Sequence, residues 1–138
     1  MKNLTVEADR RNLGQVIAFV DEILEGSGCS MKEQIQVDVA VEELFINISS
    51  YSYTESGGEA EISVTLLDDG MGVEITLIDS GVPYNPVLRP EPDLTLPAEL
   101  RPIGGLGIYM AKQSMDEMSY DYRDGKNVLT IRKHFGKQ

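Results

Sequence analysis

The sequence predicts an α+β protein built as a two-layer α/β sandwich, in which a mixed, mostly antiparallel sheet carries helices on one face. Segments whose apolar residues alternate come mainly as hairpin pairs around short turns rich in Asp and Gly, which favours antiparallel pairing. Other segments have apolar residues at the three-and-four spacing of amphipathic helices. A chain of 138 residues with 41% hydrophobic residues has the size and composition of one domain, so we expect a single domain over residues 1–138.

The first half of the chain is expected to form one strand and two helices. Alternation predicts a short edge strand at 3–8, and the helical spacing that follows predicts an amphipathic helix over 10–25. Ser30 and Glu33 have the spacing of a capping box, so a second helix should begin there and run to about Tyr53.

The second half is expected to contain two hairpins separated by a long loop and a helix. Residues 59–79 read as two alternating strands around the turn "DDGMG". All six prolines lie between Pro83 and Pro102, which excludes a long helix or a central strand there and indicates a functional loop. A helix over about 105–116 follows, and then two strands joined through Asp124–Gly125.

The net charge of −11 argues against direct binding of nucleic acid through a general basic surface. No apolar run reaches the roughly eighteen residues of a membrane span. The N-terminus turns polar before a hydrophobic signal region develops, and the single Cys29 excludes an internal disulfide. These features predict a cytoplasmic protein without a membrane partner. The negative net charge also implies that a bound phosphate would be held by backbone dipoles or a metal ion rather than by a lysine patch.

Glu43 and Asn47 lie four residues apart on the second predicted helix, so their side chains share one face. An amide oxygen can ligate a hard cation such as Mg²⁺, and a carboxylate can orient or deprotonate a hydroxyl. The alternative for this pair alone is an ordinary solvated helix surface.

A second motif, "DSGVPYNP", follows an apolar strand. Asp79 closes that strand, and Gly81 lets the backbone turn without a Cβ in the way. A carboxylate at this place can accept a hydrogen bond from an exocyclic amine such as that of adenine. The alternative is a strand-terminating turn.

The third motif is a glycine cluster, with Gly104, Gly105 and Gly107 at or just before the start of a predicted helix. Exposed backbone N–H groups at a helix N-terminus form a favourable phosphate site. The cluster is neither a Walker loop, since no Lys-Ser/Thr follows, nor a Rossmann fingerprint, since no βαβ unit surrounds it.

Together, Glu-x-x-x-Asn on a helix, Asp-x-Gly after a strand, a long loop and Gly-Gly-Leu-Gly before a helix resemble the GHKL (Bergerat-fold) superfamily of ATPases and kinases. The form "DSGVPYNP" and the ending "SMDEMSYDYRDGKNVLTIRK" are similar to its small single-domain branch, the anti-sigma-factor serine/threonine kinases. The resemblance covers essentially the whole chain and implies ATP and Mg²⁺ as cofactors.

The resemblance implies a role for each motif residue. Asn47 would be the Mg²⁺ ligand and Glu43 the catalytic base, while Asp79 would bind the adenine amine with Gly81 beneath the base. The segment 86–103 would be the ATP lid. The remaining nucleotide-binding candidates are Arg101, Gly104, Gly105, Leu106, Gly107 and Asn127.

Among these candidates, Arg101 would contact the γ-phosphate, and Asn127 would lie near adenine where the family usually has Thr. Tyr84 and Asn85 replace the usual Phe-Asp, and Tyr51 stands where a His is common. None of these departures removes a group needed to bind nucleotide or metal.

The resemblance implies a protein-serine/threonine kinase that phosphorylates an anti-anti-sigma (STAS-domain) partner and sequesters a sigma factor when that partner is unavailable. Two alternatives stay open: an ATP-holding partner-switch protein with slow or lost transfer, and a detached histidine-kinase ATPase domain. Apolar Phe19, Val39 and Ile46 lie off the main helix stripes. A neighbouring helix would cover them, or they would join a homodimer or sigma-binding surface.

Overall fold

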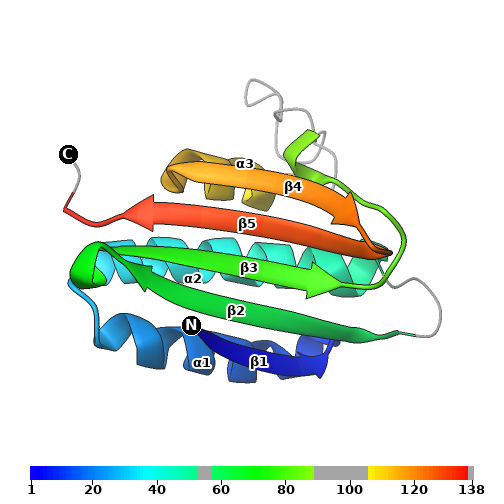
Figure 1. Cartoon of the computed structure of the whole chain (residues 1–138), viewed down its shortest axis with the longest axis horizontal. Coiled ribbons are helices and arrows are strands. Elements are labelled where there is room, and N and C mark those ends of the chain that lie inside the picture. The colour runs from blue at the N-terminus through cyan, green and yellow to red at the C-terminus, as the bar shows by residue number, and fades with distance from the viewer. Residues whose placement is uncertain (53–56, 89–105, 137–138) are drawn as a thin grey trace.

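A computed structural model describes residues 1–52, 57–88 and 106–136, and within these ranges the chain forms one five-stranded sheet (Figure 1). The sheet order is β1-β2-β3-β5-β4, and each neighbouring pair is antiparallel. This agrees with the predicted antiparallel character. The strands are β1 (Lys2–Glu7), β2 (Glu59–Leu67), β3 (Gly72–Asp79), β4 (Glu117–Arg123) and β5 (Lys126–His134).

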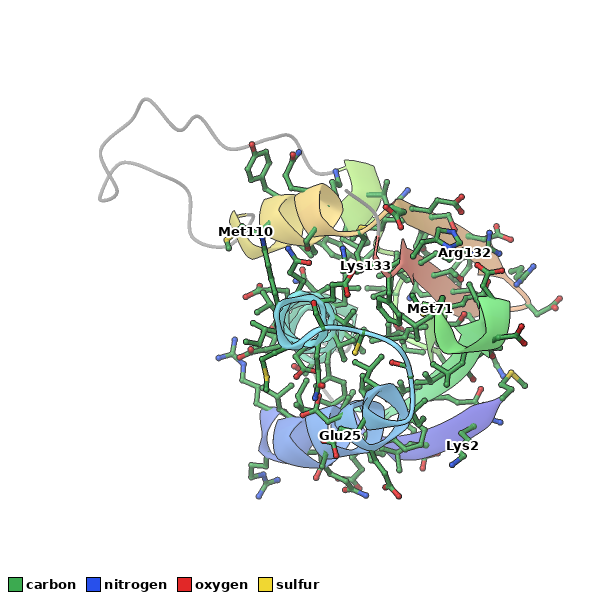
Figure 2. All side chains as sticks on the ribbon, turned by 90° about the vertical axis from the view of Figure 1, so that its left-hand side faces the viewer. Lys2, Glu25, Met71, Met110, Arg132 and Lys133 are labelled. Carbon is green, nitrogen blue, oxygen red and sulfur yellow. The ribbon has the colours of Figure 1, made fainter. Side chains whose placement is uncertain are left out.

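The helices of the described residues lie together on one face of this sheet, as the end-on view in Figure 2 shows. They are α1 (Leu13–Glu25), α2 (Met31–Asn47) and α3 (Leu106–Ser114). In Figure 1, α2 runs behind the middle of the sheet, α1 behind β1 and β2, and α3 behind β4 and β5. The predicted two-layer sandwich with its helices on one face is therefore confirmed. Among the described residues, no helix has both the length and the apolar character that a membrane span requires.

The hydrophobic core fills the space between the two layers. Alternate residues of each strand face the helices, so the strands contribute every second side chain. The apolar stripe of α2 packs onto them, and Phe45 is completely buried. On the opposite face the sheet is polar, with Arg132 on the side away from the helices (Figure 2). Fully buried side chains of this core include Val37, Val41, Leu44, Phe45, Ile62, Ile75, Leu77 and Ile131.

Local sequence signals explain where several elements begin and end. The capping box of α2 forms as predicted: the Glu33 N–H donates to Ser30 Oγ at 3.1 Å, and the Ser30 N–H donates to Glu33 Oε1 at 2.8 Å. Glu33 Oε2 also accepts the Gly136 N–H at 2.9 Å, which ties the end of the described chain to α2. Asp124 and Gly125 join β4 to β5 with φ of 54° and 74°, the left-handed pair that a type I′ hairpin turn requires.

The second helix ends earlier than predicted. It stops as an α-helix at Asn47, and the chain continues as a single π-helical turn, Ile48–Ser52. Ser49 Oγ donates to the Ile46 carbonyl at 2.9 Å, a local bond that competes with regular α-helical bonding. The first helix likewise begins with a 3-10 turn, Arg10–Asn12, capped by Asp9.

The three apolar residues that lie off the helix stripes are partly covered in this structure. Phe19 packs against the core cluster, and Val39 and Ile46 are half-buried. Of the predicted lid over 86–103, only a 3-10 turn, Pro86–Leu88, belongs to the described residues.

Candidate functional site

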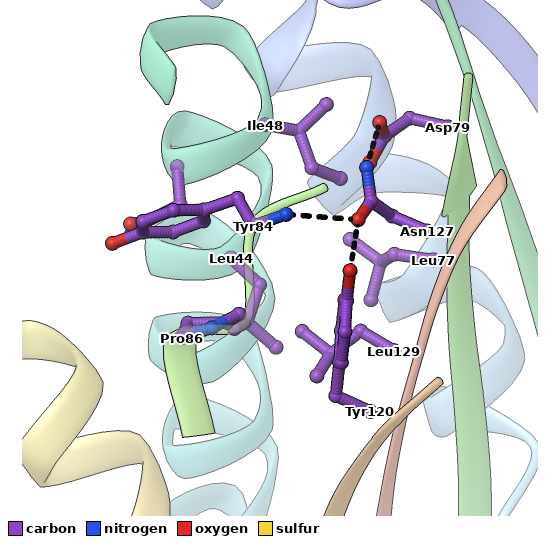
Figure 3. Close-up of a pocket in the computed structure, with 10 residues that line it drawn as sticks. Leu44, Ile48, Leu77, Asp79, Tyr84, Pro86, Tyr120, Asn127 and Leu129 are labelled. Atoms are coloured by element: carbon purple, nitrogen blue, oxygen red, sulfur yellow. Dashed lines mark hydrogen bonds between the residues drawn. The ribbon is translucent and has the colours of Figure 1, made fainter. Parts of the chain in front are cut away.

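A pocket opens between the C-terminal end of α2 and the adjoining edge of β3 and β5 (Figure 3). The buried polar side chains of the described residues are Asn47, Asp79 and Asn127, which are 7%, 4% and 3% exposed. All three line this pocket, although they come from positions far apart in the sequence. Burying polar groups is unfavourable unless they are paired, so their convergence marks the place where a ligand would find polar partners. The lining residues are Leu44, Asn47, Ile48, Leu77, Asp79, Tyr84, Pro86, Tyr120, Asn127 and Leu129.

Asp79 and Asn127 are direct partners across β3 and β5. Asn127 Nδ2 donates to Asp79 Oδ1 at 2.9 Å, and the Gly81 N–H donates to the same oxygen at 2.9 Å. The backbone of the Asp-x-Gly motif therefore turns back onto its own carboxylate. The structure brings Asp79, Gly81 and Asn127, the residues for which the resemblance implies a place at the adenine, together through hydrogen bonds, and Asp79 and Asn127 line the pocket.

The amide of Asn127 forms the centre of a wider network. Its Nδ2 also donates to the Val82 carbonyl at 2.9 Å, and its Oδ1 accepts the Tyr84 N–H at 3.1 Å. The Tyr120 hydroxyl donates to the same Oδ1. The three dashed contacts in Figure 3 show Asn127 joined to Asp79, Tyr84 and Tyr120. Asn127 thus links β5 to β3, to β4 and to the segment that follows β3.

Asn47 lies on the other wall of the pocket, at the last residue of α2. Its Nδ2 donates to the Glu43 backbone carbonyl at 2.7 Å. Its Oδ1 is buried and has no hydrogen-bond partner among the described residues. A buried oxygen left in this way carries a desolvation cost, and a hard cation would relieve it. The Asn47 oxygen therefore fits the Mg²⁺ ligand that the resemblance implies.

Glu43 sits one helical turn before Asn47 and is half-buried, but it does not line the pocket itself. Burial raises the pKa of the Glu43 carboxyl above its ordinary value, and the nearby charge of Glu42 raises it further. A carboxyl group whose pKa is moved toward neutral is better suited to exchange a proton with a hydroxyl group.

The glycine cluster lies mostly beyond what the structure describes. Arg101, Gly104 and Gly105 are outside the described residues, as is the lid beyond Leu88. Helix α3 begins at Leu106, so the cluster immediately precedes or opens a helix, as predicted. Gly107 lies in its first turn.

The open space inside the pocket is about 20 Å³, enough for about one water molecule. A purine base therefore enters only if lining side chains move. Asn47 and Asp79 belong to the packed helix and sheet. Tyr84 lies on irregular chain after β3 and Pro86 opens a short 3-10 turn, whose Val87 carbonyl accepts a hydrogen bond from the Lys112 ammonium group of α3. The Tyr84–Pro86 segment is thus the part of the lining with the least regular support.

Sequence reasoning missed Tyr120 as a site residue. The alternating pattern of β4 shows only that Tyr120 shares a face with Met118 and Tyr122. Tyr120 pairs with Leu129, two residues beyond Asn127 on β5, so only the register of β4 against β5 reveals the contact.

Comparison with known proteins relates these motifs to a family. The family described as histidine kinase-like ATPase domain matches residues 6–133. The serine/threonine-protein kinase BtrW of Bordetella bronchiseptica is 30% identical over 105 residues, which cover 76% of this chain and 73% of the relative. The serine-protein kinase RsbW of Bacillus mycoides is 30% identical over 109 residues, which cover 76% of this chain and 67% of the relative.

Solved structures share the fold at lower identity. The RsbU and RsbW domains of Rv1364c from Mycobacterium tuberculosis match with a TM-score of 0.66 at 18% identity over 100% of this chain, which spans 34% of that chain. The histidine kinase domain of the blue-light activated histidine kinase EL346 from Erythrobacter litoralis matches with a TM-score of 0.56 at 13% identity, covering 96% of this chain and 63% of that one.

The family match extends over both walls of the pocket, from the end of β1 to Lys133 near the end of β5. Membership of an ATPase family implies that the chain uses ATP. The family match, the relatives at 30% identity and the shared fold together show that this chain belongs to the histidine kinase-like ATPase domain family, the GHKL superfamily predicted from its motifs, on the branch of the RsbW and BtrW serine kinases.

Proposed function

We propose that the chain is an ATP-dependent protein-serine/threonine kinase and anti-sigma factor that phosphorylates an anti-anti-sigma partner of the STAS type. The observation that carries this proposal is the convergence of the buried Asn47, Asp79 and Asn127 on one pocket. The names of the curated relatives supply the reaction class, since they are serine and serine/threonine-protein kinases.

In this proposal the pocket holds the adenine, with its exocyclic amine donating to Asp79 and Gly81 beneath the base. Asn47 would hold Mg²⁺ through Oδ1, and the bound cation would neutralise charge on the phosphates. The triphosphate would extend toward the start of α3, where backbone N–H groups favour an anion. Its proposed contacts there are Arg101, Gly104, Gly105, Leu106 and Gly107.

Glu43 would orient the attacking hydroxyl of the partner's Ser or Thr and accept its proton. The new bond joins that hydroxyl oxygen to the γ-phosphorus of ATP, the bond to the β-γ bridging oxygen breaks, and ADP leaves. The raised pKa of Glu43 suits this task, because a base with a pKa nearer to neutral transfers the proton more effectively.

The proposal extends to partners and location. A sigma factor would be bound when the STAS partner is unavailable, within a cytoplasmic protein that acts as a single domain with a lid over 86–103. A homodimer is consistent with the resemblance, and Val39 and Ile46 retain partial exposure that such an interface could use.

The test is transfer of labelled γ-phosphate from ATP to STAS-domain proteins with an accessible Ser or Thr. We expect labelled product that requires both ATP and Mg²⁺ and that withstands acid, as a phosphoserine or phosphothreonine does. If the protein binds ATP but labels none of these partners, it is an ATP-binding regulator rather than a kinase. If it does not bind ATP at all, the nucleotide site itself is wrong.

A further inference from the structure

We propose that Tyr120, acting through Asn127, positions the carboxylate of Asp79 and thereby sets how strongly the site prefers adenine. This inference rests on the proposed function, because it takes the pocket around Asp79 as the nucleotide site. Tyr120 is a positioning residue in this account. It acts on another side chain and does not itself contact the reacting atoms.

Two hydrogen-bond donors hold the carboxylate of Asp79 in place. The Gly81 N–H and Asn127 Nδ2 both donate to Oδ1 of Asp79, each at 2.9 Å. Two donors on one oxygen fix the plane of the carboxylate and the direction in which its second oxygen points. An exocyclic amine needs an acceptor at a definite place, so a carboxylate that could rotate would bind the amine less well.

Four hydrogen bonds fix the orientation of the Asn127 side-chain amide. Asn127 donates to Asp79 and to the Val82 carbonyl through Nδ2, while Oδ1 accepts from Tyr84 and Tyr120. These four bonds match the full hydrogen-bonding capacity of an amide side chain. The reversed amide would place its oxygen against the Asp79 carboxylate and its NH₂ group against the Tyr84 N–H. The network therefore holds Asn127 in the orientation that presents a donor to Asp79.

The phenol of Tyr120 supplies one of the hydrogen bonds that hold Asn127. Tyr120 reaches Asn127 from β4, so the chain Tyr120–Asn127–Asp79 spans three neighbouring strands (Figure 3). Burial raises the pKa of Tyr120, and the negative charge of Asp79 adds to this effect. The hydroxyl therefore remains a hydrogen-bond donor throughout the ordinary pH range. Its hydrogen bond to Asn127 Oδ1 restrains the amide from the β4 side.

Positioning of the Asp79 carboxylate should affect the binding of adenine nucleotides and not that of hypoxanthine nucleotides. Adenine carries an amine at the position that faces Asp79, whereas hypoxanthine carries an oxygen there. Only the amine benefits from a well-placed carboxylate acceptor. Loss of the Tyr120 hydroxyl should therefore weaken the binding of ATP and leave the weaker binding of ITP nearly unchanged.

The experiment measures the dissociation constants of ATP and ITP, each with Mg²⁺, for the wild-type protein and for Tyr120→Phe by calorimetry. Tyr120→Phe should raise the ATP constant by about three- to tenfold, as for the loss of one net hydrogen bond. The ITP constant should change by less than about twofold. Tyr122→Phe, an exposed tyrosine on the same strand that does not line the pocket, serves as the matched control and should alter neither constant.

A double-mutant cycle tests the route of the effect. In an Asp79→Asn background, Tyr120→Phe should cause no further loss of ATP affinity, because the group it positions has been changed.

Each outcome bears on the inference separately from the proposed function. If wild-type protein binds ATP and Tyr120→Phe keeps the same preference, the positioning role is wrong and the nucleotide site stands. An equal loss for ATP and ITP would make Tyr120 a packing residue and would also overturn it. If the wild-type protein binds neither nucleotide, the proposed function fails and this inference fails with it.

Discussion

The side-chain amide of Asn47 donates a 2.7 Å hydrogen bond to the backbone carbonyl of Glu43, one turn earlier on α2. This bond uses the amide nitrogen and leaves Oδ1 buried without a partner among the described residues. The hydrogen bond therefore fixes the orientation of the Asn47 amide. Glu43 supplies the backbone acceptor that orients the amide, and Asn47 supplies the oxygen that we assign to Mg²⁺.

A first prediction follows for Asn47. Asn47→Ala should lose most of the gain in ATP affinity that Mg²⁺ provides, because the cation loses a protein ligand. We expect a weakening of about tenfold or more in the presence of Mg²⁺, comparable to other losses at metal sites. Titrating ATP with Mg²⁺ and with EDTA separates the two contributions. If Asn47→Ala keeps the wild-type difference between Mg²⁺ and EDTA, Asn47 is not the metal ligand.

The second prediction concerns Asp79, which is 4% exposed and accepts two hydrogen bonds on one oxygen. Asp79→Asn should strongly reduce the rise in melting temperature that ATP causes, since an amide can turn a donor toward the adenine amine. Asp121→Asn replaces an exposed carboxylate on β4 and should keep the wild-type rise. An unchanged ligand-induced shift in Asp79→Asn would remove Asp79 from the adenine site.

The third prediction concerns a carboxylate pair outside the pocket. Asp21 on α1 and Asp38 on α2 interact, and Oδ1 of each is buried without a partner among the described residues. Burial, with the hydrogen bond and charge of Asp21, raises the pKa of Asp38 from 3.8 to about 8. The folded protein thus retains a proton that the unfolded chain releases between about pH 4 and pH 8. The free energy of unfolding should fall across that window and level off above it.

Thermal unfolding measures this effect. Asp38→Asn removes the titrating group and keeps its shape, so its melting temperature should exceed that of the wild type by more at pH 8 than at pH 5. Asp121→Asn again serves as the exposed control and should run parallel to the wild type. If the melting temperatures of Asp38→Asn and the wild type differ by the same amount at every pH from 5 to 8, Asp38 does not retain a proton in the folded protein.

Much of the fold could be predicted from the sequence because its local signals agree with one another. The Ser30–Glu33 capping box, the Asp124–Gly125 turn and the alternating strands place most element boundaries within a few residues. The change from α-helix to π-helix after Asn47 was missed. Apolar spacing does not report that the hydrogen-bond period has lengthened by one residue.

The site could be predicted only where one motif carries its own chemistry. Asn47 and Asp79 each stand in a recognisable local pattern, so they could be found without the structure. Tyr120 has no such pattern, because its contact with Asn127 depends on how β4 and β5 are aligned. The contact between Asp21 and Asp38 depends on how α1 packs on α2, which helical periodicity leaves open.

The fourth prediction concerns the pH dependence of phosphate transfer. Because the pKa of Glu43 is raised by burial and by Glu42, transfer should increase with pH through a midpoint above that of an ordinary glutamate. Glu42→Gln removes the neighbouring charge and should move this midpoint to lower pH while transfer continues. A midpoint that does not move in Glu42→Gln would contradict the assignment of this step to Glu43.

The central claim is that one pocket both binds ATP and directs its phosphate to a hydroxyl through Glu43. The most direct measurement is the single-turnover rate of transfer from ATP to a STAS-type substrate by the wild type and by Glu43→Gln, each saturated with ATP and Mg²⁺. Glu43→Gln should bind ATP with affinity close to that of the wild type and transfer phosphate more slowly by about 10²–10⁴-fold, the contribution of general-base catalysis. Equal transfer rates in the two proteins would contradict the account.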